Sequence, residues 1–157
     1  MKFPSNGFDI AARDRVAFVQ SCWHREIVDR LRDSFLKEFS NLDGRRVDLF
    51  EVPGAFEIPL KAKVLAASGD YAAIVAAGLI VDGGVYRHEF VASAVIDGLM
   101  STQLEHCIPI FSAVLTPHDF RSEGQPEFFA EHFVLKGAEA AHACATTIVD
   151  YTRDRVA

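Results

Sequence analysis

The stretch VDGGVYRHEF, residues 81–90, combines two glycines, an acid, an arginine and a histidine within ten positions. Gly83 and Gly84 leave backbone N–H groups accessible just before a predicted helix, which is a favourable place for a phosphate group. Arg87 adds a permanent cation, and His88 adds a side chain that exchanges protons near neutral pH. A glycine pair alone is more often a tight turn. The stretch therefore indicates a phosphate site only if other ligand-binding residues gather around it.

Two further stretches hold residues that suit a small-molecule site. SCWHRE contains Trp23, the single tryptophan of the chain. Its indole is either a plug at the edge of the core or a stacking wall for a planar heterocycle. In VPGAFEIP, Gly54 permits close backbone approach, and Glu57 falls in the first turn of a predicted helix. The Glu57 carboxylate either complements the helix dipole or accepts hydrogen bonds from ligand hydroxyls.

The sequence lacks the short motifs of several common chemistries. It has no GxSxG, GxxxxGK[ST], GxGxxG or HExxH motif. Cys22, Cys107 and Cys144 are odd in number and have no CxxC spacing, which predicts neither a disulfide framework nor a metal site. We interpret them as small buried residues in a reducing compartment, and we interpret His106, beside Cys107, as structural.

Apolar runs and helical stripes alternate along the chain and would position these residues. Short apolar runs predict the strands 15–21, 45–52, 71–81 and 109–116. Helical spacing predicts a helix through Ile27 and Phe39, followed by helices at 54–70, 89–105 and 136–156, with an irregular segment at 117–134. This alternation predicts an α/β protein with a parallel sheet of about four strands. Ligands bind beyond the carboxyl ends of such strands, where the three stretches above are placed.

Length and composition predict one globular domain over residues 1–157. Half of the residues are hydrophobic and 24% are charged, which is typical of a folded protein that needs no disulfide or structural metal for stability. The formal net charge of −6 without a basic run argues against nucleic-acid binding. The polar N-terminus and the lack of an apolar run of about 18 residues argue against a signal peptide and a membrane span, so we expect a cytoplasmic protein.

VPGAFEIP, followed by a strand and the VDGG loop, resembles the 6,7-dimethyl-8-ribityllumazine synthases, and the resemblance runs from about Val16 to the last helix. Trp23, IVDGGVYRHEF and VLTPHDF are most similar to the type II branch of that family. The resemblance implies a flavodoxin-like three-layer αβα sandwich. It also implies the penultimate step of riboflavin synthesis, in which 5-amino-6-(D-ribitylamino)uracil condenses with 3,4-dihydroxy-2-butanone 4-phosphate without a metal or an organic cofactor.

The resemblance assigns parts of the substrates to the loop residues. Trp23 is expected to stack on the pyrimidine. The ribityl chain is expected to lie against Ala55, Phe56 and Glu57, and Gly54 beside them is expected to contact substrate. Backbone groups are expected to recognise the uracil edge at Leu79, Ile80 and Val81. The phosphorylated ketone is expected at Gly84 and Val85.

Two positions depart from the family pattern. Aligned without gaps, the proton-transferring histidine of the family falls on Arg87, and His88 comes one residue later. Consecutive helical residues point about 100° apart, so we expect only one of the two to face the ligand; the alignment favours Arg87, with His88 peripheral. The family's phosphate-binding arginine falls on Phe128. The remaining residues expected to contact substrate are Ser112, in place of a neighbouring subunit's aromatic residue, and Arg121, His132 and Lys136.

The type II resemblance also implies a pentamer-based homo-oligomer, a dimer of pentamers. Residues 1–14 are expected to form an N-terminal arm that adds an edge strand to a neighbouring subunit. Two alternatives to an efficient enzyme remain open at this point. One is a low-activity or non-catalytic oligomer that binds lumazines or flavins, and the other is a mainly structural assembly.

Overall fold

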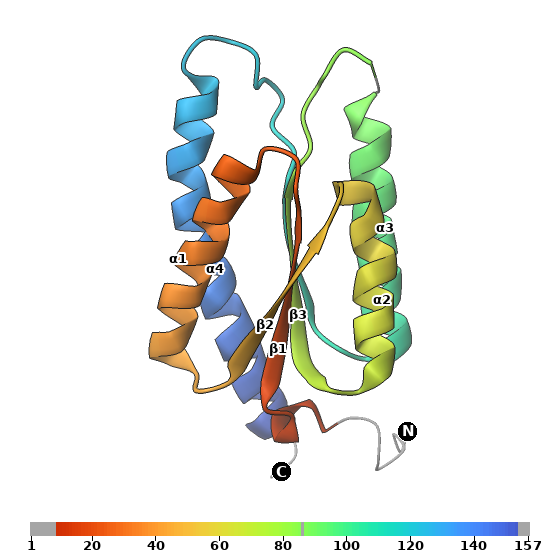
Figure 1. The fold of residues 1–157 in the computed structure, drawn as a ribbon. Coiled ribbons are helices and arrows are strands. Elements are labelled where there is room, and N and C mark those ends of the chain that lie inside the picture. The colour runs from red at the N-terminus through yellow and green to blue at the C-terminus, as the bar shows by residue number, and fades with distance from the viewer. Residues whose placement is uncertain (1–8, 86, 154–157) are drawn as a thin grey trace.

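A parallel sheet forms the central layer of the protein (Figure 1). The computed structural model describes residues 9–85 and 87–153. The strands are β1 (Arg15–Ser21), β2 (Arg46–Val52), β3 (Tyr71–Leu79) and β4 (Ile110–Leu115), in the order β2-β1-β3-β4. The helices are α1 (Arg25–Leu42), α2 (Ile58–Ser68), α3 (His88–His106) and α4 (Gln125–Arg153), with short 3-10 turns η1 (Ile10–Ala12) and η2 (Ala55–Glu57). This confirms the flavodoxin-like three-layer αβα fold.

The two faces of the sheet pack against different helices, α1 and α4 on one face and α2 and α3 on the other (Figure 1). Side chains of β1 alternate between these layers: Phe18 packs with the α1–α4 side and Val19 with the α2–α3 side. All nine residues of β3 are buried. A continuous apolar run is what a strand covered on both faces requires, and it places β3 at the centre of the sheet.

Helices α1 and α4 pack closely against each other. The apolar stripe of α1 runs through Leu31 and Phe35, which are fully buried. Gly137 of α4 lies directly over this stripe, where a Cβ atom would come within 2.8 Å of Ser34 Cβ and 3.0 Å of Phe35 N. The Ser34 hydroxyl donates to the Val134 carbonyl at 2.5 Å. A glycine is therefore required at position 137 for the two backbones to approach.

A buried polar group sets the position of α1 on the sheet. Gln20 of β1 is 2% exposed, and its Nε2 donates to Asp29 Oδ1 at 2.8 Å. Arg32 donates to the same carboxylate oxygen at 2.9 Å. Buried polar side chains need such partners, so these bonds favour one placement of the helix. The loop between β1 and α1, which carries Trp23, is thereby held at the edge of the sheet.

The segment after β4 differs from the expectation. Residues 117–134 were predicted to be irregular, but α4 already begins at Gln125 and includes Pro126. Proline is tolerated in the first turn of a helix, because its missing N–H would have no partner there, and Gly124 precedes it with φ +83°. Phe133 is fully buried and ties this early part of α4 to the core.

The cysteines also differ in part from the expectation. Cys144 is buried in the α1–α4 layer, and burial raises the pKa of its thiol to about 12. Cys107 is exposed and Cys22 is half-buried, so the expectation of three buried cysteines is wrong for these two. In the described part of the chain, no helix is long and apolar enough to cross a membrane.

The expected N-terminal arm lies partly outside the described residues. Ile10 is 1% exposed in the turn η1, which packs on the chain's own core. Arg45 fixes the next residues by donating to the carbonyls of Ala11 at 2.7 Å and Arg13 at 2.8 Å. Residues 10–13 are therefore held on their own chain, and residues 1–8 of the expected arm lie outside the described part.

We expect Gly137→Ala to lower the free energy of unfolding by about 1–3 kcal/mol, because the added Cβ overlaps the backbone of α1. Gly44→Ala is the matched control, since no heavy atom lies within 4 Å of a Cβ at that position. Its stability should change by less than about 1 kcal/mol. Urea denaturation of both variants gives the comparison, and equal stabilities would contradict the close α1–α4 contact.

Candidate active site

The loops that follow the four strands meet at one edge of the sheet. Because β1, β2, β3 and β4 run parallel, their carboxyl ends lie side by side. Hydrogen bonds join these ends: Cys22 N donates to Val52 O at 3.0 Å, and Ile80 N donates to Leu115 O at 2.9 Å. The sequence motifs that carry Trp23, Gly54 and the glycine pair are thus brought together, as the topology predicted.

Trp23 is a surface residue, with 69% of the residue exposed. The interpretation of this side chain as a core plug is therefore wrong. The indole lies beside Gly54: a Cβ at position 54 would be 3.8 Å from Trp23 Nε1 and 4.0 Å from Cδ1. The small glycine leaves space along the ring. An exposed indole of this kind provides a flat apolar wall for a planar ligand.

An ion pair holds the Trp23 loop. Arg25, at the start of α1, donates to both carboxylate oxygens of Glu51, at 2.6 and 2.8 Å, and its Nη2 lies 3.1 Å from Cys22 Sγ. The hydrogen bonds from Arg25 hold the pKa of the Glu51 carboxyl below its usual range. The pair links β2 to the loop that follows β1. It was not identified from the sequence, because nothing in the spacing of residues 25 and 51 predicts their contact.

Glu57 lies next to this wall. Its Oε2 accepts a hydrogen bond from Gly54 N at 2.8 Å, so the carboxylate does complement the start of the helical segment. Phe56 is 65% exposed, and Ala55 is half-buried beside it. Trp23, Gly54, Phe56 and the Glu57 carboxylate therefore border one accessible surface.

At the end of β3, the groups available to a ligand are main-chain groups rather than side chains. Leu79 and Ile80 are 4% and 6% exposed, and their side chains pack into opposite layers of the core. The Ile80 amide is already bonded to Leu115 O. Val81 is half-buried where the chain leaves the strand. The polar groups that this segment can present to a ligand are therefore main-chain groups.

Arg121 lies on the glycine loop. Its Nε donates to the Asp82 carbonyl at 2.9 Å, and its Nη2 is 3.7 Å from Asp82 Oδ1. A Cβ at position 84 would be 2.5 Å from Arg121 Nη2, so Gly84, with φ +78°, is required both for the turn and for this approach. The guanidinium comes from the loop after β4 of the same chain. Neighbouring Val85 is 83% exposed.

Two other residues expected to contact substrate, His132 and Lys136, are placed differently. His132 stacks on Phe128, with ring centroids 5.7 Å apart and an interplanar angle of 11°. Lys136 pairs with Glu139 at 2.7 Å. Both lie on α4 and face partners on that helix. Of these three residues, Arg121 is the one that the structure brings to the glycine loop of its own chain.

His88, and not Arg87, lines a cavity at the start of α3. Arg87 is the N-cap of α3, and its guanidinium carbon lies 5.7 Å from the centroid of the exposed Phe90 ring. The His88 side chain is only 15% exposed, with Nδ1 3.6 Å from Glu89 Oε2. This contrasts with the orientation favoured by the ungapped alignment. The reason is where the helix begins. His88 is the first residue of α3, whereas Arg87, the N-cap, lies outside the helical turn, so the two side chains leave the backbone in different directions.

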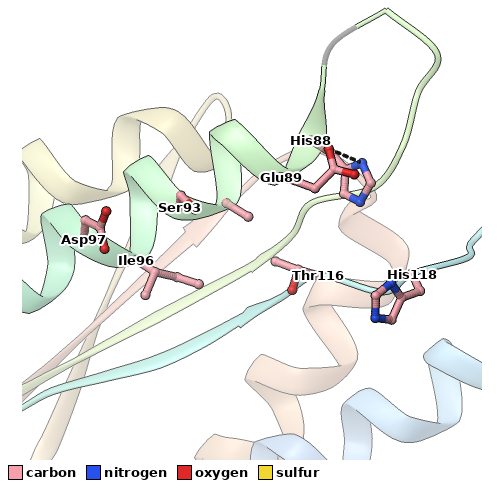
Figure 2. A pocket seen from close by; sticks show the side chains of 8 residues that line it. His88, Glu89, Ser93, Ile96, Asp97, Thr116 and His118 are labelled. Atoms are coloured by element: carbon pink, nitrogen blue, oxygen red, sulfur yellow. Dashed lines mark ion pairs between the residues drawn. The ribbon is translucent and has the colours of Figure 1, made fainter.

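The cavity beside His88 is open and has a volume of about 380 Å³. Figure 2 shows His88 and Glu89 on α3 and, across the cavity, Thr116 and His118 in the segment after β4. His118 was not among the residues selected from the sequence. Its place in the loop after the last strand is a signal that would have identified it. Within residues 9–85 and 87–153, no three histidine, cysteine or acidic side chains are grouped to hold a metal ion.

Ser112 does not join these residues in its own chain. It is exposed on β4, an edge strand, and pairs in register with Ala76 of β3. It lies in the middle of the strand and not at the carboxyl end. Within its own chain, Ser112 is therefore set apart from the loops at the carboxyl ends of the strands.

Comparison with known proteins assigns the family. A family model described as 6,7-dimethyl-8-ribityllumazine synthase matches residues 13–151. The chain is 55% identical over 146 residues to "6,7-dimethyl-8-ribityllumazine synthase 2" of Bradyrhizobium diazoefficiens, covering 92% of this chain and 88% of that protein. It is 58% identical over 137 residues to "6,7-dimethyl-8-ribityllumazine synthase" of Rhodococcus erythropolis, covering 85% and 88%. A "6,7-dimethyl-8-ribityllumazine synthase 2" of Pseudomonas syringae pv. tomato is 54% identical over 138 residues, covering 86% and 81%.

We expect Trp23→Ala to weaken the binding of a planar heterocycle such as riboflavin by roughly 1–3 kcal/mol, the range for aromatic stacking on a base. Because Trp23 is exposed, its loss should change the free energy of unfolding by less than about 1 kcal/mol. Phe35→Ala, in the core, should cost about 3–5 kcal/mol. The riboflavin affinity is measured by titration of riboflavin fluorescence, since Trp23→Ala removes the single tryptophan of the chain. Urea denaturation gives the free energy of unfolding. Unchanged riboflavin affinity would remove Trp23 from the ligand site.

Proposed function

The chain belongs to the 6,7-dimethyl-8-ribityllumazine synthase family, and from that premise we propose how its residues divide the work of the reaction. It is a transferase of riboflavin biosynthesis. It condenses 5-amino-6-(D-ribitylamino)uracil with 3,4-dihydroxy-2-butanone 4-phosphate to 6,7-dimethyl-8-ribityllumazine, releasing phosphate and water. The family match does not favour a purely ligand-binding or structural oligomer.

The observation that carries the site assignment is the exposed Trp23 indole beside Gly54 and Glu57. In our proposal the pyrimidine stacks on the indole, and main-chain groups of residues 79–81 bond its edge. The ribityl chain then runs along Ala55 and Phe56. The Glu57 carboxylate accepts hydrogen bonds from the ribityl hydroxyls, because an ionised carboxylate offers several acceptor sites.

The ketone phosphate is proposed to bind at Gly84 and Val85, where backbone amides precede α3. Arg121 supplies the cation, since its guanidinium already lies against Gly84. Charge-assisted bonds from a guanidinium to phosphate oxygens are strong and directional. His132 and Lys136 have partners on α4, and Ser112 lies in the middle of β4, so we propose that they act in the site of a neighbouring subunit.

The chemistry requires several proton transfers and no electron transfer. The ring amine of the uracil attacks the ketone carbonyl, and loss of water gives an imine. Proton removal next to the imine then expels phosphate and leaves an enol, which tautomerises to a ketone. The ribitylamino nitrogen attacks this carbonyl, and loss of a second water completes the second ring. We propose that His88 moves these protons, because its imidazole lines the cavity at the start of α3. Arg87, always protonated, is proposed to attract the phosphorylated substrate. Holding two reactive molecules together supplies much of the remaining acceleration.

A ring of subunits is proposed to complete the site. Many large apolar residues of the α2–α3 face are exposed in the single chain: Leu60, Val64, Phe90, Ile96, Met100 and Leu104. Monomeric proteins rarely expose large apolar patches, so several exposed apolar side chains on one pair of helices favour a protein interface. A head-to-tail interface between copies closes into a ring, and we propose a pentamer that pairs into a decamer, with the residues before Ile10 as the arm. The free thiols of the chain support a reducing compartment, and we propose the cytoplasm.

Mixing purified protein with both substrates tests the reaction. The product is detected by its lumazine chromophore, and one phosphate is released for each lumazine formed. In an oligomer that only binds heterocycles, the bound ligand would quench Trp23 fluorescence, but neither lumazine nor phosphate would form.

His88→Ala should lower kcat about a hundredfold, the low end of general acid–base contributions, because the two substrates are intrinsically reactive. Arg87→Ala is the matched control from the neighbouring position, and its kcat should stay within about threefold of the unaltered protein, with any effect on the KM for the ketone phosphate. The opposite ranking of the two variants would place Arg87 at the reacting atoms.

Light scattering should give a particle of five or ten chains, and not the 17.3 kDa monomer. Leu60→Glu, on the exposed apolar face of α2, should dissociate it, since burying an unpaired charge in an interface is unfavourable. Lys37→Glu is the control: Lys37 is exposed on α1, and its substitution should leave the particle intact. A stable monomer of the unaltered chain at micromolar concentration would rule out a shared site.

A further inference from the structure

The carboxylate of Asp82 occupies the donors that the proposed function gives to phosphate. Asp82 Oδ1 accepts a hydrogen bond from Gly84 N at 2.9 Å. The same oxygen lies 3.7 Å from Nη2 of Arg121. One backbone amide of the glycine loop and one guanidinium thus converge on a single anionic oxygen of the protein itself.

Position and charge make this carboxylate a close counterpart of a phosphate oxygen. Both are anionic acceptors, and both suit a backbone amide next to a helix start together with a guanidinium. The Asp82 and Arg121 side chains are 52% and 60% exposed, so the bonds are accessible to solvent and exchange readily. A tethered group competes with a free ligand at a high effective concentration.

We propose that Asp82 is a built-in competitor for the phosphate group of the ketone substrate. The inference rests on the proposed function, and it adds a residue that tunes phosphate affinity. When the substrate binds, its phosphate takes the Gly84 amide and the Arg121 guanidinium, and the Asp82 side chain swings into solvent. After the reaction, Asp82 recovers both donors and helps to expel inorganic phosphate. No bond is made or broken in this exchange except hydrogen bonds and ion pairs.

An alternative role for the Asp82 carboxylate would be to hold Arg121 in position. Other atoms already do this. The Arg121 Nε donates to the main-chain carbonyl of Asp82 at 2.9 Å, which a substitution of the side chain leaves in place. Asp119 Oδ1 accepts from Arg121 N at 3.0 Å and from Ser122 N at 3.1 Å, which fixes the loop around Arg121. Removing the Asp82 carboxylate therefore frees the donors while the cation stays anchored.

Inorganic phosphate is the probe, and its Kd is measured by calorimetry on the intact oligomer without substrates. Asp82→Ala should lower the Kd by roughly fivefold, the factor that corresponds to one exposed charge pair at about 4 Å. Asp82→Asn keeps an oxygen that accepts from Gly84 N but loses the charge. Its Kd should therefore lie between the Kd of the unaltered protein and that of Asp82→Ala. Asp33→Ala is the matched control: this aspartate is also exposed and also paired with an arginine, Arg32, but lies on α1 away from the loop. Its Kd should equal that of the unaltered protein.

An unchanged or higher phosphate Kd in both Asp82 variants would overturn the proposal, because a positioning residue gives that result. Undetectable phosphate binding in every variant would overturn it as well. Arg121→Ala should raise the Kd, and Asp82→Ala should give a smaller gain in that background, because the carboxylate then competes for the Gly84 amide alone. These measurements need no turnover. Failure of lumazine formation would therefore count against the proposed reaction alone, while the order of phosphate affinities still decides the role of Asp82.

Discussion

Burial of β3 between two helical layers is the constraint on which the rest of the structure depends. All nine residues of this strand are buried, so both faces of the sheet must be covered by helices. The helical connections provide this cover and lead to parallel strands: β1 to its neighbour β2, β2 past β1 to β3, and β3 to its neighbour β4. The four carboxyl ends then lie at the same edge, and the loops that follow them have to meet there.

The contacts that shape these loops are different in kind from the contacts in the core. Arg25 with Glu51, Glu57 with Gly54, and Asp82 with Arg121 are hydrogen bonds and ion pairs of exposed or partly exposed groups. Such interactions are individually weak in water and exchange readily. The core therefore fixes where the loops begin and end, while the loops themselves are able to exchange internal partners for ligand groups. The carboxylate of Asp82 is placed for such an exchange.

The single chain also presents surfaces that its own fold does not use. The apolar residues of the α2–α3 face, exposed Ser112 on an edge strand and the His132–Phe128 stack on α4 have no role in the core. The edge strands β2 and β4 additionally offer unpaired backbone groups, which proteins commonly cover. A ring of copies would satisfy these surfaces together.

The order of strands and helices and the position of the Trp23, Gly54 and glycine-pair loops were predictable from the sequence. Periodicity and turn residues are local properties, and the parallel topology follows from their alternation. The VPGAFEIP and VDGG motifs also carried the family resemblance. The early start of α4 was missed, since Pro126 and Gly124 resemble loop residues until Phe133 is seen to be buried. The placement of Arg121 on Gly84, and of His88 rather than Arg87 in the cavity, was decided by the tertiary structure alone. Both depend on side-chain directions and on contacts between segments far apart in the chain, which spacing along the sequence does not encode.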